Sequence, residues 1–343
     1  MQPGVAMMEK RALVLNSHEA WVAQLGRMPF EMDVVVGLSG RHHGGWDERM
    51  RPVPANARLI DLATARRQES SYGVAIGHNL TDLFELKDLE LPKLLVLHTT
   101  LEGRLAEQGG GLDLSRLSQE TRRYLKLIRA HSLAVSPMKK ASWDLPADVV
   151  GSCVSVDDYP PPSQELAQGL RIVNHLNRRR HILKADFCDA AFLGISVKIV
   201  GHNDDIPGVV AARNWADLKS TIQASRFFIH TAEPGLEDGF NMAMAEAMAG
   251  GLAVLGNRHP TSVVEHGVTG YLSDDPAELN EHANRLLQDR QLSLKMGLAA
   301  REQARELFHP DRFVSGIARS VKRCRQKFFA RGTKTSPRRR KKR

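Results

Sequence analysis

The 343-residue sequence has few cysteines, few aromatic residues and no long hydrophobic run. Its three cysteines, Cys153, Cys188 and Cys324, are too few and too far apart for a disulfide framework or a C-x-x-C metal site. No uninterrupted apolar segment reaches the roughly 18 residues that a membrane-spanning helix needs. The first residues lack the apolar core of a secretion signal. A reducing cytoplasm is therefore the expected location.

The charge is distributed unevenly along the chain. The sequence has 48 Lys and Arg residues against 39 Asp and Glu residues, a formal net charge of +9. Thirteen of the basic residues, and no acidic residue, lie in segment 319–343. The rest of the chain has 35 basic and 39 acidic residues, a net charge of −4. The body of the protein is thus mildly acidic, and the basic character belongs to the tail.

Short apolar, β-rich segments predict strands that are buried on both faces of parallel sheets. In the first half these segments are 12–15, 33–38, 58–62, 73–78, 93–98 and 132–136, and a helix is predicted over 115–130. In the second half they are 170–174, 196–200, 226–230, 253–256 and 269–272. Two sets of alternating strands and helices predict an α/β fold of two doubly wound, Rossmann-like domains facing across a cleft.

The domain boundaries are predicted from composition. Residues 9–160 are expected to form an N-terminal Rossmann-like domain, and residues 166–310 a second Rossmann-like domain. Between them, segment 159–163 (YPPPS) suits neither a helix nor a central strand and is interpreted as the linker. A C-terminal helix is predicted over 311–330. The basic tail, residues 331–343, is of low complexity and is predicted to be disordered.

The most informative segment runs from Asp238 to Gly250 and reads D-G-F-N-M-A-M-A-E-A-M-A-G. A helix is predicted to begin near Phe240, after a turn-rich loop. The first N–H groups of a helix lack internal partners, and together with the helix dipole they bind anions. Asp238 and Glu246 bracket this helix start. A carboxylate can accept two hydrogen bonds from a vicinal diol such as ribose, so the pair could hold one elongated ligand with its phosphates in between.

This segment resembles the motif of retaining glycosyltransferases of family 4, which have the GT-B fold: an acid, seven residues, then Glu. The similarity continues through segments 251–255, 263–272 and 296–308, whereas the first half resembles the family only in its strand pattern and in His98. The resemblance implies transfer from a nucleotide-diphosphate sugar without a bound metal or other cofactor. The sequence contains no D-x-D triplet and no His/Cys cluster with zinc spacing.

The resemblance also implies roles for individual residues. Glu246 would bind the ribose, and Asp238 the hydroxyl groups of the donor sugar, with Glu237 as the alternative acid. The backbone N–H groups of Phe240, Asn241, Met242 and Ala243 at the predicted helix start would bind the diphosphate, and Gly239, also assigned to donor binding, would let the ligand approach closely. His98 would contact the donor sugar; a hydrogen-bonded core histidine is the other interpretation.

Basic residues follow the first strand of the second domain. Alignment with the family places His175 and Arg180 at its two phosphate-binding positions, with Arg179 as a near alternative. Arginine chelates phosphate oxygens well, but these residues could equally form a solvated helix face. The sequence departs from the family pattern at Asp238, usually Glu, at Asn241, usually Gly, and at His175, usually Arg.

Loops that follow strands of the first domain are assigned to the acceptor side, with His18, His78 and Asn79 as candidates. The leading hypothesis is a retaining, metal-independent glycosyltransferase acting on a cell-surface glycan or lipid-linked saccharide. Two alternatives are a glycosyltransferase that reaches nucleic acid through its basic tail and a catalytically silent GT-B binding protein. A same-fold nucleotide-sugar epimerase is a minor one.

The basic tail has three open interpretations: a solubilising end, attraction to anionic lipids at the inner membrane face, or attachment to nucleic acid.

Overall fold

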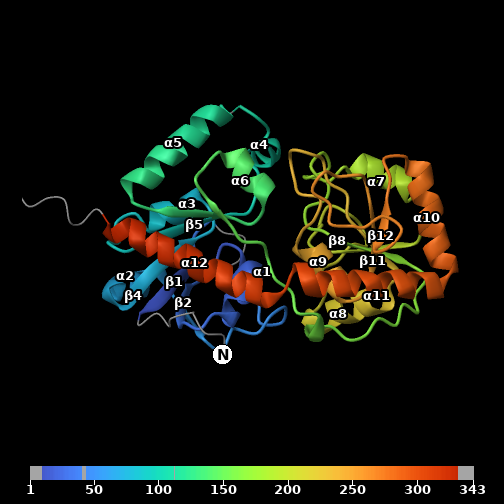
Figure 1. The fold of residues 1–343 in the computed structure, drawn as a ribbon, viewed down its shortest axis with the longest axis horizontal. Coiled ribbons are helices and arrows are strands. Elements are labelled where there is room, and N and C mark those ends of the chain that lie inside the picture. The colour runs from blue at the N-terminus through green and yellow to red at the C-terminus, as the bar shows by residue number, and fades with distance from the viewer. Residues whose placement is uncertain (1–9, 41–43, 112, 331–343) are drawn as a thin grey trace, which may run out of the picture.

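The computed structural model describes residues 10–40, 44–111 and 113–330. Two parallel sheets, each covered by helices, form two domains that lie side by side (Figure 1). The predicted α/β architecture of two Rossmann-like domains with a C-terminal helix is confirmed. The predicted disordered tail lies outside the described residues. Within the described part of the chain, no helix is both long and apolar enough to cross a bilayer.

The first sheet has seven parallel strands in the order β3-β2-β1-β4-β5-β6-β7. These strands are β1 (Arg11–Leu15), β2 (Met32–Val35), β3 (Ala57–Ile60), β4 (Tyr72–Gly77), β5 (Lys93–Leu97), β6 (His131–Ala134) and β7 (Asp148–Val149). Each of the six predicted segments forms a strand. The two-residue edge strand β7 was not predicted, because two residues are too few to show a pattern.

Helices cover both faces of this sheet. They are α1 (Glu19–Val22), α2 (Leu62–Arg67), α3 (Leu80–Glu85), α4 (Leu101–Gln108), α5 (Leu114–Leu127) and α6 (Pro137–Trp143), with short 3-10 turns at Ala23–Arg27 and Glu69–Ser71. Successive side chains of a strand point to opposite faces. Accordingly, Ala12 and Val14 of β1 pack in one core with Trp21 of α1, while Leu13 and Leu15 pack in another with Ala65 of α2.

The second sheet has five parallel strands in the order β12-β11-β10-β8-β9. These strands are β8 (Gly169–Ile172), β9 (Val197–Val200), β10 (Phe227–Ile229), β11 (Ala253–Gly256) and β12 (Gly270–Leu272). Its helices are α7 (Ala185–Ala191), α8 (Trp215–Ala224), α9 (Met242–Ala249), α10 (Pro276–Gln288) and α11 (Arg290–Leu307). Phe228 packs on the side of α8, α9 and α11, and Phe227 on the side of α7 and α10.

The last helix, α12 (Pro310–Phe329), returns to the first domain (Figure 1). Its residues Phe313, Ile317, Val321 and Cys324 recur every three or four positions, so they form one face, and all of them belong to the core of the first sheet. The chain therefore crosses between the domains twice, once through the segment that contains a 3-10 turn at Val156–Asp158 and once before α12. The two crossings touch where the Val154 N–H donates to the Phe308 carbonyl at 2.9 Å.

Candidate active site

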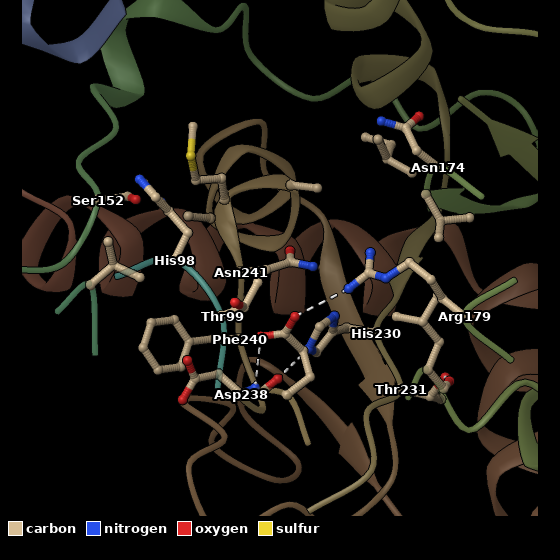
Figure 2. A pocket seen from close by; sticks show the side chains of 18 of the residues that line it. His98, Thr99, Ser152, Asn174, Arg179, His230, Thr231, Asp238, Phe240 and Asn241 are labelled. Carbon is tan, nitrogen blue, oxygen red and sulfur yellow. Dashed lines mark hydrogen bonds and ion pairs between the residues drawn. The ribbon is translucent and has the colours of Figure 1, made fainter. Parts of the chain in front are cut away.

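A cavity of about 420 Å³ lies between the two domains, beyond the carboxyl ends of strands from both sheets. In Figure 2, His98 of the first domain lies on one side of it and Arg179 of the second domain on the other, with Asp238 and His230 between them. This is the position that the sequence predicted for a ligand, since parallel sheets bind ligands at their carboxyl edges.

Lys139, near the start of α6, is one of the cations that line this cavity. Its Nζ lies 2.9 Å from Oε1 of Glu237 and 2.8 Å from Oδ2 of Asp238. The Lys139 side chain is only 7% exposed, and that of Asp238 only 1%. The second Asp238 oxygen, Oδ1, is buried and has no hydrogen-bond partner within the described residues. Sequence reasoning missed Lys139, although it closely follows a strand at the expected edge of the sheet.

The acids and cations of the cavity hold each other in the charged state. Burial by itself would raise the pKa of the Glu237 carboxyl, but Lys139 and Arg179 outweigh that effect and lower the pKa. Burial would lower the pKa of Lys139, but Glu237 and Asp238 outweigh it and raise the pKa. Glu237 and Lys139 are therefore ionised at neutral pH, and a ligand that enters meets their fixed charges.

The backbone that carries Asp238 is held from both domains. The imidazole of His230 donates from Nε2 to the carbonyl of Asp238 at 3.1 Å. Burial lowers the pKa of His230 to about 4, so this ring is neutral at pH 7. From the first domain, the Thr100 hydroxyl donates to the carbonyl of Leu236. The position of Asp238 thus depends on contacts made across the cleft.

The start of α9 faces the same cavity. Asn241 caps this helix, because its side-chain oxygen accepts the N–H of Met244 at 2.9 Å. The N–H groups of Met242 and Ala243 belong to the first turn and have no acceptor within the helix, and both residues line the cavity together with Phe240. The predicted anion-binding helix start is therefore at the cleft.

Gly239 packs tightly against a neighbouring loop of the second domain. Its N–H donates to the Thr261 hydroxyl at 2.8 Å, so this group is not offered to a ligand. A Cβ at this position would lie 2.6 Å from both the Nδ1 of His259 and the backbone N of Ser262. Glycine is needed here because segment 259–262 packs against it, and Gly239 is not among the residues that line the cavity.

Of the basic residues in the segment after β8, some line the cavity and others lie outside it. Arg179 lines the cavity and pairs with Glu107 of the first domain at 2.8 Å and with Glu237 at 3.2 Å. Arg180 instead turns outward to two carboxylates of α7, those of Asp186 and Asp189. His175 is exposed and is not among the residues that line the cavity. The structure thus places Arg179, and neither of the two aligned positions, at the candidate phosphate site.

The three predicted histidines of the first domain lie together at its carboxyl edge. His18 stacks on His98 with ring centroids 4.2 Å apart, and Nδ1 of His78 lies 2.9 Å from Nε2 of His98. Burial, reinforced by the neighbouring imidazoles, lowers the pKa of His78 to about 3 and that of His98 well below its ordinary value. All three line a second cavity of about 490 Å³, together with Asn79, which caps α3.

Glu246 is not among the residues that line the cleft cavity. Its Oε1 accepts a hydrogen bond from Arg51 of the first domain at 2.5 Å, and its side chain is 13% exposed. The Arg51 guanidinium also lies over the ring of Trp215, 4.4 Å from the centroid. Burial raises the pKa of Glu246, and Arg51 offsets only part of that rise. The predicted ribose-binding carboxylate is thus covered, by a residue that sequence reasoning did not identify.

Comparison with known proteins agrees with this geometry. Residues 194–289 match the model of the family described as glycosyl transferases group 1. Over 83 residues the chain is 36% identical to N-acetyl-alpha-D-glucosaminyl L-malate synthase of Bacillus anthracis. That match covers 23% of this chain and 22% of the relative, so it concerns one part of each protein.

Solved structures are similar over nearly the whole chain. HepE of Anabaena in complex with UDP and glucose superposes with a TM-score of 0.66 at 14% identity, over 92% of this chain and 100% of HepE. Sucrose-phosphate synthase of Thermosynechococcus elongatus superposes with a TM-score of 0.62 at 13% identity, over 94% of this chain and 100% of the synthase. The chain therefore has the GT-B fold, and its second domain resembles the group 1 glycosyl transferases.

Proposed function

We propose that this protein is a metal-independent, retaining glycosyltransferase that takes its sugar from a nucleotide-diphosphate sugar. The observation that carries this proposal is the meeting of Asp238, Arg179 and the start of α9 in one interdomain cavity. The family match in residues 194–289 supports the reaction class. The assignment of retention rests on the resemblance of the motif that contains Asp238 and Glu246.

The cavity suits a diphosphate leaving group. Cleavage of a glycosyl–phosphate bond leaves extra negative charge on the phosphates, and preorganised cations and N–H dipoles stabilise that charge. Arg179 supplies a cation, and the N–H groups of Met242 and Ala243 supply the dipoles. Lys139 lies in the same cavity. In the ligand-free structure Glu107 and Glu237 neutralise Arg179, so we expect a phosphate to compete with these two carboxylates.

The donor sugar is then expected between Asp238 and His98. Asp238 pairs with Lys139 and has one oxygen without a hydrogen-bond partner in the described residues, so it can accept a hydrogen bond from a sugar hydroxyl. His98 borders both this cavity and the second one, which extends into the first domain. We assign the acceptor to that second cavity, beside His18, His78 and Asn79.

For the acceptor we propose a cell-surface glycan or a lipid-linked saccharide. HepE is solved with UDP and glucose, and TarM of S. aureus, which superposes with a TM-score of 0.58 at 11% identity over 76% of this chain and 58% of TarM, is solved with UDP and α-GlcNAc-glycerol. These neighbours support a nucleotide sugar and a glycan-like acceptor, and they make UDP-sugars the first donors to test.

Thermal unfolding with UDP-, GDP-, ADP- and dTDP-sugars tests donor binding. A ligand at 100 times its Kd adds about 2.7 kcal/mol to the free energy of unfolding. Transfer to a glycan acceptor, with the anomeric configuration of the product read by NMR, then tests the reaction. Stabilisation without transfer or donor hydrolysis would support a silent binding protein, and no stabilisation by any nucleotide sugar would reject the proposal.

A further inference from the structure

The second cavity, to which we assign the acceptor, is lined by the loops that follow β1, β4 and β5 and by α4 of the first domain. Its volume of about 490 Å³ is within the range of small-molecule sites. Apart from the three histidines, its ionisable side chains among the described residues are those of Arg104 and Glu107, both on α4. The charge that an acceptor meets in this cavity therefore depends on these two residues.

Arg104 keeps a positive charge that the described part of the cavity does not neutralise. Glu107 is paired elsewhere, because its Oε1 lies 2.8 Å from Nε of Arg179 in the second domain. Arg104, one turn earlier on α4, is partly buried and forms no ion pair and no side-chain hydrogen bond with any described residue. Burial keeps two of the histidines neutral at pH 7, since it lowers the pKa of His78 to about 3 and that of His98 well below its ordinary value.

Two buried polar atoms of the same cavity lack a hydrogen-bond partner within the described residues. Asn16 is only 2% exposed; its Nδ2 donates to the Gly45 carbonyl at 3.0 Å, whereas its Oδ1 has no donor. His78 is 6% exposed; its Nδ1 lies 2.9 Å from Nε2 of His98, and its own Nε2 has no partner. Buried polar groups are nearly always hydrogen-bonded in folded proteins. These two atoms are therefore suited to the hydroxyl groups of a bound ligand.

We infer that the acceptor is an acidic saccharide, whose carboxylate or phosphate group binds Arg104 while its hydroxyl groups bind Asn16 and His78. A guanidinium matches both anions, because its parallel N–H groups donate to two oxygens at once. The inference rests on the proposed function, since it narrows the acceptor of the same transferase. It makes Arg104 a specificity-determining residue and gives it no part in the bond-breaking step.

Isothermal titration of the full chain tests the inference with glucuronate, glucose 6-phosphate and glucose, and with the corresponding galactose and mannose series. The donor cavity is first saturated with the nucleoside diphosphate that stabilises the chain most, so that probe phosphates cannot bind at Arg179. At neutral pH we expect an acidic probe to bind about tenfold or more tightly than its neutral parent sugar. A preference for the uronate indicates a carboxylate on the acceptor, and a preference for the sugar phosphate indicates a phosphorylated acceptor.

Substitution of Arg104 separates charge recognition from the rest of the cavity. Arg104→Gln should raise the Kd of the acidic probe about 10- to 100-fold and leave that of the neutral sugar unchanged, because only the charge-assisted contact is lost. Arg104→Lys should recover part of the affinity, since it keeps the charge but not the two-pronged geometry. The matched control is Arg116→Gln, an exposed arginine of α5 that lines neither cavity. Thermal unfolding verifies that each variant is folded.

Three results would overturn the inference. They are equal affinity for acidic and neutral sugars, an acidic preference that persists in the folded Arg104→Gln variant, and failure of every acidic probe to bind.

The outcome for the proposed function is separate. Efficient transfer to a neutral saccharide, with no gain from an acidic group, would retain the transferase and reject an acidic acceptor. Binding of an acidic sugar that depends on Arg104, in a chain that no nucleotide sugar stabilises, would instead reject the transferase and retain the anion site.

Discussion

Arg51 of the first domain covers the carboxylate of Glu246 in the second, with 2.5 Å between the guanidinium nitrogen and Oε1. The backbone beside it is also joined to the second domain, because the Trp215 N–H donates to the carbonyl of Arg49 at 2.8 Å. If Glu246 binds ribose, the nucleotide has to displace Arg51 first. The ion pair then competes with the donor.

Removal of Arg51 should therefore strengthen nucleotide binding. We expect Arg51→Ala to lower the Kd for the preferred nucleotide about tenfold, since a hydrogen bond between charged groups contributes about 1.5–3 kcal/mol. Glu246→Ala should raise that Kd by at least the same factor. Isothermal titration measures both, with Arg49→Ala, an exposed residue of the same segment, as the control. Weaker binding by Arg51→Ala would show that Arg51 itself contacts the nucleotide.

Two neighbouring arginines should differ in their effect on donor binding. Arg179→Ala should raise the Kd of the nucleotide diphosphate about 10- to 100-fold, because a charge-assisted contact with phosphate is lost. Arg180→Ala should leave that Kd unchanged, since Arg180 pairs with Asp186 and Asp189 outside the cavity. Equal effects of the two substitutions would argue against the phosphate position proposed for Arg179.

Loss of Lys139 should destabilise the protein. Lys139→Met would leave Glu237 and Asp238 as buried carboxylates without their shared cation, at a cost of about 3–5 kcal/mol in the free energy of unfolding. Adding Glu237→Gln and Asp238→Asn should recover most of that stability but not the activity. Urea denaturation measures the stability, and Lys140→Met, on the exposed side of α6, is the control. A fully stable Lys139→Met protein would contradict the ion-pair argument.

Asp238 should affect transfer more than nucleotide affinity. Asp238→Asn keeps the shape of the side chain, so we expect an unchanged Kd for the free nucleotide and a kcat that is lower by about 100-fold or more. Asp238→Glu adds a methylene at a position that is 1% exposed, which should cost about 1–3 kcal/mol of stability. A variant Asp238→Glu as stable and active as the parent would show that the site has more room than the structure indicates.

The buried histidines should make stability depend on pH. The pKa of His78 is about 3 in the folded protein and about 6.5 in an unfolded chain. Below pH 6.5 the unfolded chain therefore binds a proton that the folded protein excludes, and stability falls as the pH falls. From pH 7 to pH 5 this amounts to about 2 kcal/mol for one histidine. His78→Asn should reduce that dependence in thermal unfolding, and His202→Asn, at an exposed position, should not.

Local patterns were sufficient to predict the sheets. Segments such as 94–97 and 253–256 are continuously apolar, and parallel strands buried on both faces require such runs. The same logic placed His98 at the end of β5 and Asp238 before α9, and the structure brings both to one cavity. The residue that follows a strand and the residue that precedes a helix are set by the local sequence. They can therefore be predicted without knowledge of the whole fold.

Contacts between the domains were not predictable in this way. Arg51 and Glu246 are 195 residues apart, and no periodicity in the chain pairs them. Lys139 was overlooked because a lysine in a helix is most often a surface residue. At Gly239 the sequence alone does not separate a glycine required by a packed neighbouring loop from a glycine required by a ligand.

The return of α12 to the first sheet has a consequence for biosynthesis. The apolar face of Phe313, Ile317 and Val321 completes the core of the first domain, yet it is translated after the whole second domain. At about 5–20 residues per second, the ribosome needs on the order of 10–30 s to advance from β7 to α12. During that interval the nascent first domain exposes the part of this sheet face that α12 later covers, so we expect it to be a client of chaperones until synthesis is almost finished.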